Sequence, residues 1–161
     1  MRDKLDLAPA APAHLSGSCR TPLVPALLSE GTNGVLLKTG TKHMKLITDS
    51  LADKLLANGR AQRAAMDRGD DALDFKPVVK LFTSDAQCTW LLTELDPDGG
   101  LAFGLCDLGL GCPELGYVSL VERSAVRGKL GLPIERDQHF IANETISVYA
   151  GVARARGCIV T

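Results

Sequence analysis

The fold is decided by residues 88–106, which read CTWLLTELDPDGGLAFGLC. Residues 88–95 are rich in leucine, threonine and an aromatic side chain, and this composition predicts a strand. Residues 96–100, DPDGG, have the Asp, Pro and Gly that tight turns prefer. Residues 101–106 are again mostly apolar and predict a second strand. A strand, a short turn and another strand together predict an antiparallel hairpin.

Further strands and helices flank this hairpin. Strands are predicted over 77–82 before it and over 115–119 after it, with 134–141 as a candidate fifth strand. Helices are predicted over 49–58, with Gly59 as C-cap, over 60–68 as one or two further turns, over 120–127, and from Thr145 to Gly157. Consecutive strands joined by short turns form a meander. We therefore expect an α+β fold with four to five antiparallel strands and short helices at both ends, packed as two layers.

Residues 1–43 differ in composition from the rest of the chain. They hold four of the eight prolines and carry a net charge of +2, whereas residues 44–161 carry −3. Their apolar clusters are too small to form a core. We expect a single domain over 44–161, preceded either by a disordered tail or by residues that lie upstream of a true start at Met44.

Charge and cysteine content narrow the classes of function. A net charge of −1 gives no electrostatic case for broad nucleic-acid binding. The five cysteines are scattered and include no C-x-x-C pair, so a zinc site is not expected, and free thiols fit a reducing cytoplasm. No apolar run approaches the roughly 20 residues of a transmembrane helix. A cytoplasmic protein with no cofactor and no membrane partner is expected.

The candidate catalytic residues are three carboxylates and the one histidine within 44–161: Glu94, Asp96, Asp107 and His139. Such a donor set could hold Mg²⁺ or Mn²⁺ in a hydrolase or nuclease. Asp137 alternates with His139 along the candidate strand 134–141, and an Asp–His pair could orient a general base. A solvated strand face explains the same alternation.

Strand geometry argues against one compact acidic site. Pairing across the turn places Glu94 opposite Ala102 or Phe103, several residues from Asp107. Alternation along the first strand of the hairpin places four side chains on one face: Trp90, Leu92, Glu94 and Asp96. The stronger interpretation is that these carboxylates lie at sheet edges and turns, where they are solvated and keep the sheet soluble. No metal site is predicted.

Two other features point to partner binding. Trp90 is the only tryptophan, and aromatic anchors dominate the energy of many interfaces. Arg60, Arg63 and Arg68 form the only basic cluster of the domain and could meet a phosphate or an acidic partner. The glycine-rich run 104–116 lacks the lysine of a P-loop and the spacing of a dinucleotide-binding loop, so its glycines are assigned to bulges and turns.

Several stretches from Met44 onward carry a resemblance to a known family. They are MKLIT (44–48), NGR (58–60), DFKPVVKLFT (74–83), TWLLTELDP (89–97), AFGLCDLG (102–109), PELGYVSL (113–120) and LGLPIER (130–136). In these stretches the chain resembles the bacterial domain-of-unknown-function family 2958, whose members are often found on plasmids and integrative elements. The resemblance covers 44–161, implies no catalytic residues, and implies mobile-element neighbours such as conjugation, maintenance and anti-defence genes.

Three functions remain open at this point. The first is a non-enzymatic protein of a bacterial mobile element that binds a protein partner, with anti-defence or element maintenance as its role. The second is a metal-dependent nuclease or hydrolase that uses the candidate catalytic residues. The third is direct DNA or RNA binding through the three arginines. The absence of a catalytic motif and the near-neutral charge favour the first.

Overall fold

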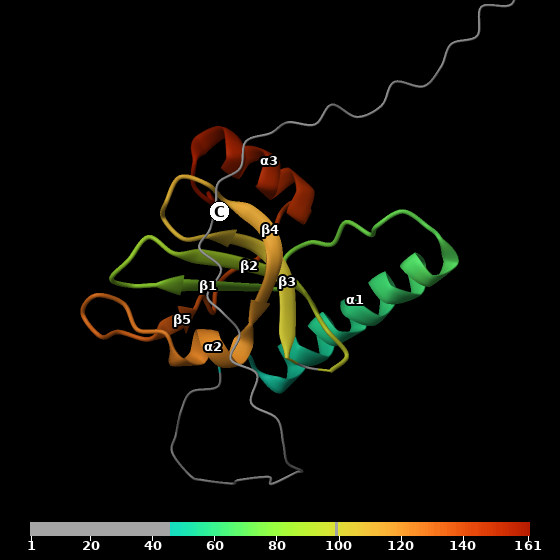
Figure 1. The fold of residues 1–161 in the computed structure, drawn as a ribbon, viewed down its shortest axis with the longest axis horizontal. Coiled ribbons are helices and arrows are strands. Elements are labelled where there is room, and N and C mark those ends of the chain that lie inside the picture. The colour runs from blue at the N-terminus through green and yellow to red at the C-terminus, as the bar shows by residue number, and fades with distance from the viewer. Residues whose placement is uncertain (1–45, 99) are drawn as a thin grey trace, which may run out of the picture. The chain divides into compact units, whose positions relative to one another are not determined.

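The computed structural model describes residues 46–98 and 100–161, and these residues form an α+β fold (Figure 1). The elements in chain order are α1 (Asp49–Arg68), β1 (Val79–Thr83), β2 (Thr89–Leu95), β3 (Leu101–Asp107), β4 (Glu114–Ser119), α2 (Leu120–Ala125), β5 (Ile134–Arg136) and α3 (Ile146–Arg156). The predicted fold class is thus confirmed. No helix in these described ranges has the length and apolar character needed to cross a membrane.

The strands form one antiparallel sheet in the order β4-β3-β2-β1-β5. Strands β1 to β4 follow one another as the predicted meander, and β5 returns to pair with β1 at the other edge. The predicted hairpin is the β2–β3 pair at the centre of this sheet. Strand β2 is buried along nearly its whole length, because helices cover both of its faces.

The core lies on both sides of the sheet. Neighbouring residues of a strand point to opposite faces, and Trp90 packs with Leu55 of α1 whereas Leu91 packs with Ala150 of α3. The expected two-layer packing is therefore wrong: α1 and α3 cover opposite faces of the sheet. A core on both faces explains why β2 carries an uninterrupted apolar run, Trp90–Leu92, in place of strict alternation.

Helix α1 is a single helix and does not end at Gly59 as predicted. A Cβ atom on Gly59 would lie 2.1 Å from the carbonyl oxygen of Leu95, so this glycine permits close packing of α1 against β2. Asn58 supports the same contact, because its Nδ2 donates to the carbonyl of Thr93 at 2.8 Å. The actual C-cap is Gly69, which has a φ of 77° and lies in the left-handed region.

The last strand is shorter than the predicted 134–141 and ends at Arg136. The chain turns there because the Asp137 carboxylate accepts a hydrogen bond from the backbone N–H of His139 at 3.0 Å, which is an Asx turn. This bond and the nearby Lys80 ammonium hold the pKa of Asp137 below its usual value. The predicted alternation of Asp137 and His139 on one strand face is therefore wrong.

Candidate functional site

A β-bulge in β2 determines which way Glu94 points. Strand β2 pairs Leu92 with Gly104 and then Glu94 with Phe103, so one extra residue of β2 fits between these two pairs. Beyond the bulge the alternation is reversed, and Glu94 lies on the face opposite to Trp90. The expectation that Trp90, Leu92, Glu94 and Asp96 share one face is thus wrong, although the expected pairing of Glu94 with Phe103 is confirmed.

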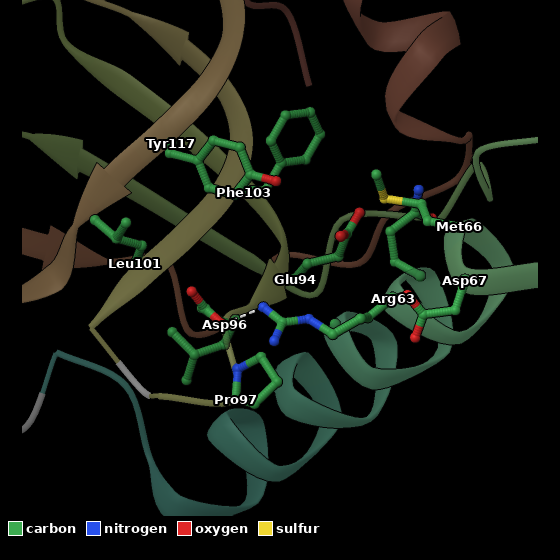
Figure 2. Close-up of a pocket in the computed structure, with 12 residues that line it drawn as sticks. Arg63, Met66, Asp67, Glu94, Asp96, Pro97, Leu101, Phe103 and Tyr117 are labelled. Atoms are coloured by element: carbon green, nitrogen blue, oxygen red, sulfur yellow. Dashed lines mark hydrogen bonds and ion pairs between the residues drawn. The ribbon is translucent and has the colours of Figure 1, made fainter.

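The carboxylate of Glu94 lies in a groove of about 550 Å³ between the sheet and the second half of α1 (Figure 2). Strands β3 and β4 contribute its apolar wall, and α1 contributes a mixed one. The main lining side chains are Arg63, Met66, Asp67, Glu94, Asp96, Leu101, Phe103 and Tyr117. We refer to this feature as the Glu94 groove.

Two aromatic rings form one side of the Glu94 groove. Phe103 and Tyr117 are cross-strand partners of β3 and β4, and their ring centroids are 5.1 Å apart with a 58° angle between the planes. Tyr117 is 68% exposed, and Met66 on the facing helix is 65% exposed. Large apolar side chains exposed on two sides of one groove are typical of a surface that binds something.

Glu94 is the least exposed ionisable group of the groove walls and retains only 9% of its accessible surface. Burial raises the pKa of Glu94, and a hydrogen bond from the Thr93 side chain partly opposes this increase. Within 46–98 and 100–161, no lysine, arginine or histidine forms an ion pair with Glu94. Figure 2 shows its carboxylate directed into the space between the aromatic pair and Met66.

Among the described residues that line the groove, Arg63 is the one arginine, and its guanidinium already forms an ion pair. Arg63 Nη2 donates to Oδ1 of Asp96 at 3.0 Å, and this ion pair joins α1 to the β2–β3 turn. Arg68 forms a second exposed ion pair, with Asp70 at 2.8 Å. The three arginines Arg60, Arg63 and Arg68 therefore do not form one uncommitted basic patch on α1.

The four candidate catalytic residues do not converge. Asp107 pairs opposite Thr89, and the five β2 residues from there to Glu94 span roughly 16 Å at about 3.3 Å each. Each Asp107 oxygen accepts a backbone hydrogen bond, one from Gly109 at 2.8 Å and one from Ile159 at 2.9 Å. Asp107 thereby fastens the C-terminal residues to the end of β3.

His139 lies elsewhere again, after β5 at the opposite edge of the sheet from β4. In the part of the chain that the structure describes, no three His, Cys, Asp or Glu side chains gather as a metal-binding group. Asp96 is the one candidate near Glu94, and its carboxylate is held by Arg63.

Trp90 is part of the core, with 1% of its surface exposed. The guanidinium of Arg123 from α2 lies 5.8 Å above its ring. The indole therefore contacts the interior of the protein, and the exposed aromatic side chain that lines the Glu94 groove is Tyr117 instead.

Sequence reasoning missed the aromatic pair and the role of α1. Phe103 and Tyr117 both lie on strands that were predicted, but their contact depends on the register of β3 against β4. That register is fixed across the glycine-rich segment 108–113, whose conformation has no simple sequence signal. The groove wall from α1 was missed because residues 60–68 were expected as separate turns after a C-cap at Gly59, and not as the continuation of one helix packed on β2.

Of three comparisons with known proteins, one gives a match. No curated protein and no solved structure matches the chain. A family match extends over residues 46–160, which includes every helix and strand described above. The chain belongs to the family described as "Protein of unknown function (DUF2958)".

Proposed function

We propose that this domain is a non-enzymatic binding module that holds a segment of a partner protein in the Glu94 groove. The observation that carries the proposal is the groove itself, which has a volume of about 550 Å³. Exposed Met66 and Tyr117 lie on opposite sides of it, and the nearly buried Glu94 lies between them. A concave, mostly apolar site with a few directed polar groups is the usual form of a binding site. The separation of Asp107 and His139 from Glu94 removes the reason to assign hydrolysis to these residues.

The biological setting is part of the same proposal. Resemblance to a bacterial family often found on plasmids and integrative elements supports a role in the cytoplasm for a mobile element. The partner would then be a host protein, for example a defence component that the module inhibits, or an element-encoded maintenance protein. The acidic balance of residues 44–161 supports a protein partner over nucleic acid.

Site-specific photo-crosslinking tests the proposal. A benzophenone amino acid is placed at Tyr117 in the full chain, which is produced in a bacterium that carries the mobile element. The same group at Ile141, which is 81% exposed and is not among the lining residues of the groove, is the matched control. A discrete protein adduct from position 117 and none from position 141 is expected. Equal adducts from both positions, nucleic-acid adducts, or no adduct would each contradict the proposal.

A further inference from the structure

We infer that the groove takes an arginine side chain from an extended segment of the partner, paired with Glu94 and stacked against Tyr117. The inference rests on the proposed function and specifies the chemistry of the occupant. It starts from Glu94, which retains 9% of its surface, directs its carboxylate into the groove and forms no ion pair with a cation of the described chain. Burying an unpaired charge is costly, and an opposite charge supplied by a partner offsets that cost.

The charges of the groove wall favour a cationic occupant. Glu94, Asp67 and Asp96 face one guanidinium, that of Arg63, and Asp96 already holds it at 3.0 Å. The remaining groove charge is negative. Complementary charge helps to determine which partners associate, and a negatively charged partner would be repelled by this groove.

The aromatic pair distinguishes arginine from other cations. Phe103 and Tyr117 lie on the same cross-strand row as Glu94, so a cation paired with the carboxylate lies within reach of the rings. A guanidinium stacks on aromatic faces and pairs with a carboxylate through two parallel hydrogen bonds, whereas an ammonium does neither as well. The rings and the carboxylate together match a planar cation.

The size and rim of the groove describe what flanks the arginine. The volume of about 550 Å³ exceeds that of one side chain, so neighbouring residues of the segment also enter. Leu101 and Met66 are exposed on the rim and offer apolar contacts. The expected ligand is therefore a short extended sequence with an arginine next to an apolar residue.

Selection from a library of random linear peptides displayed on phage, with the full chain as bait, tests the inference. Peptides are retained when their binding is lost with the Tyr117→Ala variant, because that loss marks binding in the groove. Retained peptides are expected to share an arginine. Their dissociation constants are then measured by fluorescence anisotropy for the parent chain and for Glu94→Gln.

Three results are expected from these measurements. Replacing the peptide arginine with glutamine weakens binding about tenfold or more, and Glu94→Gln weakens it by a similar factor. The two changes together cost little more than either alone, as expected for two groups that contact each other. Glu114→Gln, which removes a charge from the first residue of β4, outside the groove lining, leaves the dissociation constant unchanged.

The failures of the inference and of the proposed function are distinct. Tyr117-dependent peptides without a basic residue, or with affinity unchanged by Glu94→Gln, would overturn the inference and leave the binding module in place. Lysine peptides that bind as tightly as arginine peptides would also overturn the choice of a planar cation. If no Tyr117-dependent peptide is recovered, the groove is not a peptide site and both proposals are wrong.

Discussion

At the scale of single residues, Trp90 and Glu94 show how one strand serves two purposes. Both lie on β2, four positions apart, and simple alternation would direct them to the same face. The bulge after Leu92 separates them, so that the indole enters the core and the carboxylate enters the groove. The bulge is therefore what allows a fully buried strand to place an acidic group at a surface site.

The burial of Trp90 leads to a prediction for stability. Trp90→Ala is expected to destabilise the domain by roughly 3–5 kcal/mol, because a large core side chain is replaced by a cavity. The indole Nε1 has no hydrogen-bond partner in the described structure, so Trp90→Phe removes no internal hydrogen bond and is expected to cost less. Urea denaturation of both variants measures the difference. An alanine variant as stable as the parent would show that the indole is not a core group.

Replacement of Glu94 is predicted to stabilise the domain, whereas replacement of Trp90 destabilises it, and the effect at Glu94 depends on pH. Its pKa is raised above the reference value of 4.5, chiefly by burial, so the folded domain binds this proton more tightly than the unfolded chain does. The corresponding contribution to stability is present below the unfolded pKa and is lost as pH rises through the folded pKa. Glu94→Gln removes the charge, and is expected to raise the Tm at neutral pH.

The advantage of Glu94→Gln over the parent should shrink as the pH is lowered toward 4.5, where the parent also loses the charge. Thermal scans at several pH values measure this convergence. Asp67→Asn, which removes an exposed charge from the same groove, is the control and is expected to change the Tm little. A Glu94→Gln variant that is less stable than the parent at neutral pH would mean that the carboxylate has a stabilising partner.

At the scale of elements, the position of α1 on the sheet creates the groove. The helix lies close against β2 at Gly59, and its later turns then form the wall that carries Arg63 and Met66. A glycine within a helix costs about 1 kcal/mol relative to alanine, so its presence here is compensated by packing. Without that close approach, the Arg63–Asp96 ion pair could not join the helix to the β2–β3 turn in its present geometry.

Two helical glycines with different surroundings test this account. Gly59→Ala is expected to destabilise the domain by roughly 1–3 kcal/mol, because the new methyl group would overlap the carbonyl of Leu95. Gly151 in α3 has open space where its Cβ would be, so Gly151→Ala is expected to stabilise by up to about 1 kcal/mol. Chemical denaturation of the two variants gives the comparison. Stabilisation by both would show that helix propensity alone matters at these sites.

The sequence was sufficient for elements with strong local signals. The β2–β3 hairpin, the start of α2 after Ser119 and the end of α3 at Gly157 all form as predicted, because each depends on neighbouring residues. Gly59 was misread because glycine that ends a helix and glycine that packs against a strand look identical in a single sequence. The groove was not foreseen because it depends on a bulge, a register and a helix position that tertiary packing determines.

At the scale of the whole molecule, the described residues share their hydrophobic contacts through the sheet. One core cluster includes side chains from α1 and from β1, β2, β3 and β5, and the other joins the sheet to α3. Asp107 adds a polar tie between β3 and the C-terminal residues. Because strand β2 belongs to both clusters, loss of either one would expose a face of the central strand, and we expect the elements to unfold together.

The extent of the folding unit gives the last prediction. We propose that residues 44–161 suffice for folding, since the four prolines and small apolar clusters of 1–43 offer no core of their own. A chain that begins at Met44 is expected to unfold within about 5 °C of the full chain, a difference of roughly 1 kcal/mol for a domain of this size. Differential scanning calorimetry of both chains measures the two midpoints. A larger fall on removing 1–43 would show that this segment packs on the domain, and that the Glu94 groove has to be studied with it present.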